Sequence, residues 1–293
     1  MAKAPARVWA LIAFGLLAIG SSPILIRLAG DVPALTLAAW RTMAVTAVFV
    51  PIAAMQSRDE IAAFSRREWA LAIGAGVLLG LHFMAWIVSV QLTSIASASV
   101  LVTMSPIFIA VLGAVFLSER PSRRTAAGIA VAVVGAVLIG LSEGNEGGAY
   151  PNPALGNVLA LTAAVLVSIY LLIGRAVRQK TTFVAYFALL NGAAAVTCLV
   201  GCLVAGVPLG LPLPVALLAI AMGIGPGLIG HGSFAYALKY LPAALIGLLS
   251  LAEPVLASTV ALFSFQEVPS ALGALGMAIV LAAIAAVVTS REA

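Results

Sequence analysis

The chain has 293 residues, of which 63% are hydrophobic and only 9% are charged. A soluble domain averages about 25% charged residues, so this composition excludes a water-soluble fold of this length. The net charge of +5 does not indicate a nucleic-acid partner, because the basic residues lie in short loops between apolar runs, where they act as determinants of membrane topology. Membrane lipids are therefore the expected surroundings of the protein.

Ten apolar runs predict ten transmembrane helices, since a helix needs about 20 apolar residues to cross a bilayer. They cover residues 8–28, 34–55, 69–90, 96–116, 124–142, 155–175, 182–205, 214–237, 242–264 and 270–289. We interpret the first run as a transmembrane helix and not as a signal peptide, because it is longer than the apolar region of a signal peptide. The sequence thus predicts an all-α, multi-pass membrane protein.

The distribution of basic residues predicts the orientation of these helices. Of the 15 basic residues, all except Arg27 and Arg41 lie on one side of the predicted membrane. The positive-inside rule makes that side cytoplasmic. Both termini are therefore expected inside the cell, and the expected location is the inner membrane of a bacterium.

An internal repeat relates the two halves of the chain. A shift of 148 residues brings Pro106 onto Pro254, Glu119 onto Glu267 and Ser122 onto Ser270. The repeats, 1–146 and 147–293, form one integrated membrane domain and hold five predicted helices each. Because five is odd, the second repeat enters the membrane in the opposite orientation, which is the architecture of many secondary transporters. A duplication retained for packing alone is the alternative.

Several predicted helices and loops carry short motifs: Trp40-Arg41, His82-Phe83 with Trp86, Leu92-Thr93-Ser94, Pro106, Leu117-Ser118-Glu119-Arg120-Pro121, Gly230-His231, Leu238-Lys239-Tyr240-Leu241-Pro242-Ala243 and Glu253-Pro254. With these motifs the chain resembles the drug/metabolite transporter superfamily, in its EamA type, over nearly its whole length. The resemblance implies a basket of ten helices around a central cavity, lined by the first, third, fourth, sixth, eighth and ninth. It also implies a small-molecule substrate, because members export amino acids, other metabolites and drugs.

Glu253 is the deepest acidic residue and lies directly before Pro254 in the ninth run. An ionisable side chain at the centre of a transmembrane helix costs about 2.5–3.5 kcal/mol, so it usually faces a cavity or a partner. A carboxylate here is expected to bind a cationic substrate group or a proton. The alternative is a protonated carboxyl that bonds to a neighbouring helix. Ser105 is its counterpart in the first repeat, and Ser250 lies one turn before it.

The two histidines fall at nearly equivalent places in the repeats, because the shift brings His82 onto the residue before His231. Neutral histidine can bond a ligand or carry a proton, although a lone buried histidine is more often a packing group. Trp86 lies one turn beyond His82 and shares its helix face. Tyr170 lies in the middle of the sixth run, and packing is the alternative for both aromatic residues.

Arg41 lies within the second run, about five residues from its outer end. An arginine there either clamps a carboxylate with two hydrogen bonds or extends to the lipid headgroups. Ser22 is a further polar candidate in the first run. Helix kinks, as hinges, are expected at residues that weaken a helix: Pro23, Pro106, Gly225, Pro226, Gly227 and Pro254. Tight helix packing through the glycines is the alternative.

These residues favour a secondary carrier, most plausibly an exporter of amino acids or similar metabolites, with proton coupling or facilitated exchange. A carrier of cationic drugs is the main alternative, and a nucleotide-sugar carrier ranks third. An intramembrane enzyme is disfavoured because His231 and Ser233, two residues apart, lie on different helix faces. A channel is also disfavoured, since no rings of like charge are visible. We expect no catalytic residue, cofactor or metal, and a monomer or a homodimer.

Overall fold

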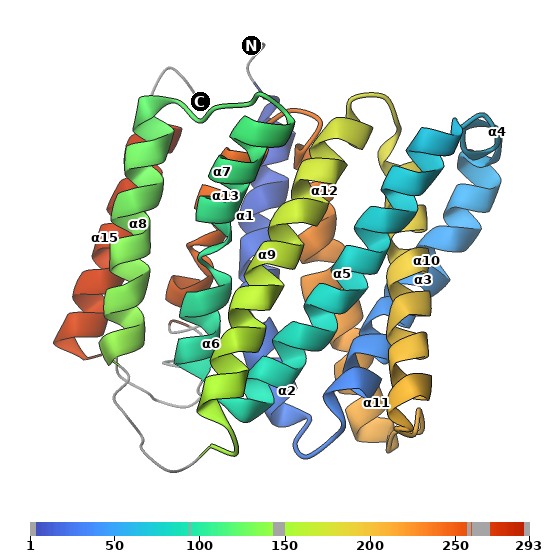
Figure 1. Ribbon diagram of the computed structural model, residues 1–293, viewed down its shortest axis with the longest axis horizontal. Coiled ribbons are helices and arrows are strands. Elements are labelled where there is room, and N and C mark those ends of the chain that lie inside the picture. The colour runs from blue at the N-terminus through green and yellow to red at the C-terminus, as the bar shows by residue number, and fades with distance from the viewer. Residues whose placement is uncertain (1–3, 94, 143–149, 257–258, 260–269, 290–293) are drawn as a thin grey trace.

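The computed structural model describes residues 4–93, 95–142, 150–256, 259 and 270–289, and within these ranges the chain forms helices and no strand (Figure 1). The helices are α1 (Ala6–Gly20), α2 (Ser22–Leu28), α3 (Ala34–Gln56), α4 (Arg58–Ala62), α5 (Arg66–Leu92), α6 (Ile95–Val102), α7 (Ser105–Phe116), α8 (Arg123–Ser142), α9 (Pro153–Arg178), α10 (Phe183–Ala205), α11 (Leu213–Met222), the π-helix η1 (Gly223–His231), α12 (Gly232–Ala237), α13 (Ala243–Ser250) and α15 (Ala271–Val288).

Eight helical segments of the described chain are long and apolar enough to cross a membrane: Ala6–Leu28, Ala34–Gln56, Arg66–Leu92, Ser97–Phe116, Pro153–Arg178, Phe183–Ala205, Leu213–Ala237 and Ala271–Val288. They confirm eight of the ten predicted runs and an all-helical membrane protein. The fifth run forms α8. The ninth is helical over Ala243–Leu256, and most of its remainder lies outside the described residues.

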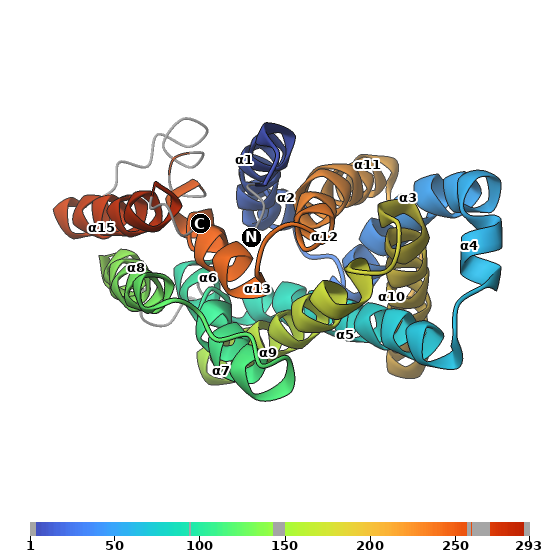
Figure 2. The same cartoon turned by 90° about the horizontal axis from the view of Figure 1, so that it is seen from above.

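The helices form a flattened bundle with two edges and a central part (Figure 2). At one edge α8 and α15 lie side by side, and at the other lie α3, α10 and the short α4. Between them, α1, α5, α9, α12 and α13 surround the centre of the molecule. The start of α1, the end of α15 and the α4 turn lie at the same end of the bundle (Figure 1).

At this end of the bundle, polar side chains cap the first turns of α5 and α10. The Ser65 side chain accepts a hydrogen bond from the backbone N–H of Glu68, and the Glu68 carboxylate accepts one from the backbone N–H of Ser65. Such a reciprocal capping box satisfies two N–H groups that the first turn of α5 cannot pair internally. The α10 start is fixed by Glu60, whose carboxylate accepts hydrogen bonds from the N–H and the hydroxyl of Thr182, at 2.7 and 2.5 Å.

Three of the helical segments that correspond to predicted spans are interrupted near their middle, where the sequence predicts kinks. The first is interrupted at Ser21, two residues before Pro23, and the others have turns at 103–104 and 251–252, two residues before Pro106 and Pro254. Proline removes a hydrogen-bond donor and clashes with the preceding turn, which explains these positions. The turns at 103–104 and 251–252 differ by 148 residues, the shift that relates the two halves of the sequence.

The eighth predicted run contains the π-helix η1, with Pro226 inside it. A Cβ atom added at Gly223 would lie 2.6 Å from the carbonyl oxygen of Arg41, and one at Gly230 would lie 2.4 Å from Cγ1 of Ile19. The glycines therefore let η1 approach α1 and α3 closely. The predicted irregular helix and the alternative of tight packing are both present here, while a hinge function of Gly225, Pro226 and Gly227 stays a prediction.

Candidate functional site

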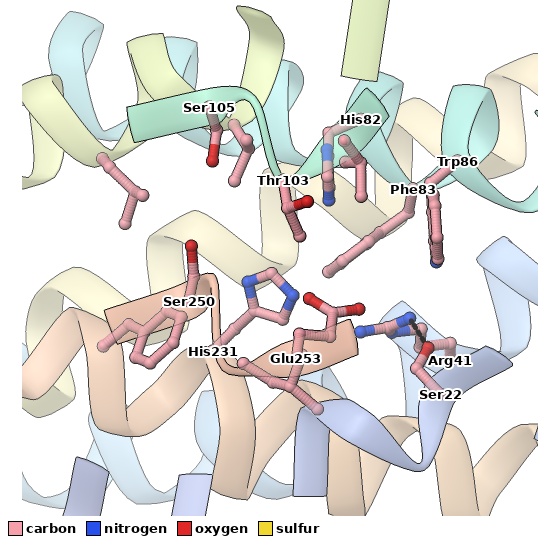
Figure 3. Close-up of a pocket in the computed structure, with 15 residues that line it drawn as sticks. Ser22, Arg41, His82, Phe83, Trp86, Thr103, Ser105, His231, Ser250 and Glu253 are labelled. Carbon is pink, nitrogen blue, oxygen red and sulfur yellow. Dashed lines mark hydrogen bonds between the residues drawn. The ribbon is translucent and has the colours of Figure 1, made fainter. Parts of the chain in front are cut away.

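A cavity lies in the middle of the bundle, where the irregular segments meet (Figure 3). The space open to water-sized molecules is about 50 Å³, which holds about four waters and is too small for a metabolite. The lining residues are Ile19, Ser22, Arg41, His82, Phe83, Trp86, Val102, Thr103, Ser105, Val167, Leu171, His231, Phe234, Ser250 and Glu253. They come from the six predicted lining helices and also from the second predicted helix, through Arg41.

Arg41 is the only basic residue in this lining. Its side chain is 2% exposed, so the interpretation that it extends to the lipid headgroups is wrong. Its Nη1 donates to Ser22 Oγ at 3.3 Å, and its Cζ lies 4.0 Å from the centre of the Phe83 ring. Its Nε has no hydrogen-bond partner in the described part of the chain. The guanidinium is therefore held by the Ser22 hydroxyl and the Phe83 ring, and among the described residues its Nε–H remains available as a hydrogen-bond donor.

Glu253 is the only acidic residue in the lining. In Figure 3 its carboxylate points toward Arg41, next to His231. Among the described residues, however, the only ion pair joins Arg175 and Glu119. Arg41 and Glu253 thus line one buried cavity, and no ion pair joins them in the described part of the chain. In this structure the space that they line admits only water-sized groups.

The two histidines lie close together, with ring centres 6.0 Å apart, a contact that the sequence did not predict. His82 Nδ1 lies 2.9 Å from the carbonyl oxygen of Ala163, and since a carbonyl only accepts, Nδ1 carries the proton. The Nε2 of neutral His82 is then an acceptor. His231 Nδ1 lies 2.8 Å from the Tyr170 hydroxyl.

Tyr170 does not line the cavity, although the sequence offers it as a candidate. It is 1% exposed and lies behind His231. When its hydroxyl donates to Nδ1 of His231, the imidazole has its proton on Nε2. Tyr170 is therefore placed to fix the tautomer of His231, and its contact with a ligand stays a prediction.

Three aromatic side chains besides the histidines line the cavity. Trp86 lines it next to Phe83, and Phe234 lines it from α12. The sequence indicated Trp86 as a candidate, contained Phe83 only as part of a motif, and did not indicate Phe234. Phe234 is three residues after His231, so helical spacing could have indicated that both side chains lie on the same face. Thr103 was also missed, and its hydroxyl is occupied by the carbonyl oxygen of Ser99 at 2.8 Å.

The Arg175 side chain connects three parts of the chain at the end of the bundle that holds α4, through one ion pair and one hydrogen bond. Arg175 Nε lies 3.1 Å from an oxygen of Glu119, and Arg175 Nη1 donates to the carbonyl oxygen of Leu238 at 2.7 Å. This cluster joins α9 to the segment between α7 and α8 and to the segment after α12. The sequence placed Arg175 among the basic residues that determine topology, and nothing in its spacing revealed these partners.

Comparison with known proteins gives matches over almost the whole chain. The EamA-like transporter family matches residues 7–141 and again residues 154–289. An aromatic amino acid exporter, YddG, from Ancylobacter novellus is 29% identical over 247 residues, covering 83% of this chain and 84% of that protein. A probable terminal-alkyne amino-acid exporter from Streptantibioticus cattleyicolor is 30% identical over 190 residues, covering 64% of this chain and 62% of that protein.

A solved crystal structure has the same fold, with a TM-score of 0.80 over 99% of both chains and 20% sequence identity. The two family matches leave only the ends and the central connection uncovered. Together with the apolar helices, they identify a multi-pass protein of the inner membrane. The chain belongs to the EamA-like transporter family.

Proposed function

We propose that this transporter exports amino acids, or closely related zwitterionic metabolites, across the inner membrane. The observation that carries the proposal is the cavity that holds Arg41 and Glu253 without an ion pair between them. An uncompensated buried charge is costly, so two charges held apart in a cavity favour a ligand that carries both opposite charges. An amino acid is the smallest common metabolite with that pattern.

The geometry suggests how such a ligand binds. Its carboxylate bonds to Arg41, which offers an unpaired Nε, and its ammonium group bonds to Glu253. The Nε2 atoms of His82 and His231 supply further hydrogen bonds, and Ser22 and Ser250 line the same space. An apolar or aromatic side chain of the ligand packs against Trp86. The printed names of the two similar exporters, one for aromatic and one for terminal-alkyne amino acids, agree with this substrate class.

The transporter has ten membrane helices with both termini in the cytoplasm, arranged as inverted repeats 1–146 and 147–293. The double family match and the equivalent turns at 103–104 and 251–252 support the repeat. Inverted repeats allow two nearly equivalent states that open to opposite sides of the membrane. Pro23, Pro106, Pro226 and Pro254, with Gly225 and Gly227, are the positions at which the helices bend between these states.

Glu253 also couples transport to protons. It is the only carboxyl group of the cavity lining, and a site that binds either a proton or a substrate ammonium group exchanges one for the other. Export of an amino acid is then linked to proton entry. Glu253→Gln preserves the shape of the side chain but removes its titration.

Flux from proteoliposomes of purified protein tests the proposal. Vesicles loaded with a mixture of amino acids are expected to release particular amino acids faster than protein-free vesicles, with a rate that an imposed pH gradient changes. Glu253→Gln is expected to abolish the response to the gradient, and Asp59→Asn, at an exposed carboxylate of α4, serves as the control. A Glu253→Gln protein with undiminished, gradient-driven release would overturn the coupling role. Release of cationic drugs but of no amino acid would support the alternative carrier.

A further inference from the structure

A second, larger hollow lies on the outside of the bundle, in the faces of α3, α5 and α10. Its volume is about 730 Å³, within the range of sites that hold drug-sized ligands. We name it the α3–α10 groove. It is lined by Val50, Ala53, Ala54, Arg58, Ile61, Ile73, Val77, Ala188, Leu189, Gly192, Ala193, Val196 and Thr197. None of these residues lines the central cavity.

The groove is apolar except at one end. Only Arg58 and Thr197 of its lining are polar, and the Thr197 hydroxyl donates to the carbonyl oxygen of Ala193 at 2.8 Å. Arg58 is exposed at the start of α4, and its guanidinium has no ion pair with another described residue. The nearby Glu60 carboxylate is already occupied by Thr182. The groove therefore presents a long apolar surface that ends at Arg58, a cation without an ion-pair partner among the described residues.

The absence of a side chain at Gly192 opens the groove. A Cβ atom added at Gly192 would meet no heavy atom within 4 Å. Ala188 and Val196 lie one turn before and one turn after it, on the same face of α10. Because α3, α5 and α10 all have the length and hydropathy of membrane helices, this face meets lipid hydrocarbon.

Trp69 places the charged end of the groove at the level of the lipid headgroups. It lies one turn before Ile73 on α5 and is 36% exposed. Tryptophan is enriched where the hydrocarbon meets the headgroups. Arg66 and Arg67 begin the same helix, so the potential at this end attracts anions. Arg58 is therefore at the depth of a lipid phosphate.

We propose that the α3–α10 groove binds an anionic phospholipid, with one acyl chain along its apolar lining and the headgroup phosphate at Arg58. An arginine guanidinium binds phosphate through two parallel hydrogen bonds. Anionic lipids of the cytoplasmic leaflet are attracted by about 1 kcal/mol for each nearby Lys or Arg. An amphiphile with one anionic end and one apolar chain matches both the charge and the shape of the groove.

Native mass spectrometry of the full-length protein in detergent, with added phosphatidylglycerol or phosphatidylcholine, tests the site. The wild type is expected to retain phosphatidylglycerol in preference to phosphatidylcholine. Gly192→Leu fills the groove and is expected to lose retention of both lipids. Arg58→Gln is expected to weaken retention of phosphatidylglycerol about fivefold, with phosphatidylcholine unchanged.

Matched controls separate these effects from changes in folding or in overall charge. Gly74 on α5 also has no heavy atom within 4 Å of an added Cβ but does not line the groove, so Gly74→Leu is expected to retain lipid. Arg66→Gln removes a charge at the same end of the bundle and is expected to keep more of the lipid preference than Arg58→Gln. Equal lipid retention by the wild type and Gly192→Leu would overturn the proposal. If the wild type is a dimer and Gly192→Leu dissociates it without changing the bound lipid, the groove binds a second copy of the chain and not a lipid.

Discussion

The close contact between η1 and α3 makes Gly223 a sensitive position for both stability and transport. In Gly223→Ala, the added Cβ would lie 2.6 Å from the Arg41 carbonyl oxygen and 2.7 Å from the Ala44 Cβ. The backbone oxygen cannot rotate away as the end of a flexible side chain can. The substitution therefore forces η1 and α3 apart at the residue that carries the only cation of the cavity lining.

The size of the displacement follows from these distances. Restoring an ordinary contact of 3.4 Å from 2.6 Å requires a shift of about 0.8 Å. Overpacking of this kind typically costs about 1–3 kcal/mol. For a chain of this size, such a loss lowers the thermal midpoint by about 5 °C. The same shift moves the Arg41 guanidinium relative to Glu253, so we expect transport to fall at least about tenfold, as misplacement by about 1 Å does at other sites.

Thermal unfolding in detergent measures the first effect, and flux from proteoliposomes measures the second. Gly225→Ala is the control for stability, because it lies on the same π-helix and an added Cβ would meet nothing within 4 Å. Its midpoint is expected within about 2 °C of the wild type, since alanine favours helix over glycine. Gly74→Ala is the control for transport. Equal midpoints for Gly223→Ala and Gly225→Ala, or full transport by Gly223→Ala, would refute this reasoning.

Two further pairs of variants test contacts at the end of the bundle and beside the cavity by thermal unfolding. Arg175→Gln is expected to lower the midpoint more than Glu119→Gln, because Arg175 also bonds to a backbone carbonyl. Each lost charged contact is worth about 1 kcal/mol. The reverse order of the two midpoints would contradict this arrangement of contacts. Tyr170→Phe is expected to cost about 1 kcal/mol by removing the hydrogen bond to His231. Tyr186→Phe is expected to cost nothing, because its hydroxyl has no partner in the described chain, and an equal loss in both tyrosine variants would contradict this assignment.

The sequence was sufficient to predict most of the helices, because a membrane span is encoded locally by its length and hydropathy. The segments Ala34–Gln56 and Phe183–Ala205 each lie within one residue of their predicted bounds at both ends. Proline position also predicted the interruptions before Pro106 and Pro254. The short helix α4 was not predicted, since five residues leave too weak a periodic signal.

The sequence predicted those residues of the candidate site that are ionisable, because ionisable residues are rare within transmembrane helices. Few ionisable residues lie within the apolar runs, and Arg41, His82, His231 and Glu253 all line the cavity. Their mutual contacts could not be predicted, because they depend on how distant helices pack. For the same reason, the sequence could not show that Tyr170 lies behind His231 or that the Arg41 guanidinium packs on the Phe83 ring.

The most direct test of the central claim measures whether transport requires both charges of the substrate. Proteoliposomes of wild-type protein are loaded with phenylalanine, with phenethylamine, which lacks the carboxylate, or with 3-phenylpropionate, which lacks the amine. Recognition by both Arg41 and Glu253 predicts rapid protein-dependent release of phenylalanine and slow protein-dependent release of both analogues, each measured above the leak from protein-free vesicles. Release of either analogue as fast as phenylalanine would contradict an assignment in which the two opposite charges of the cavity select a zwitterion.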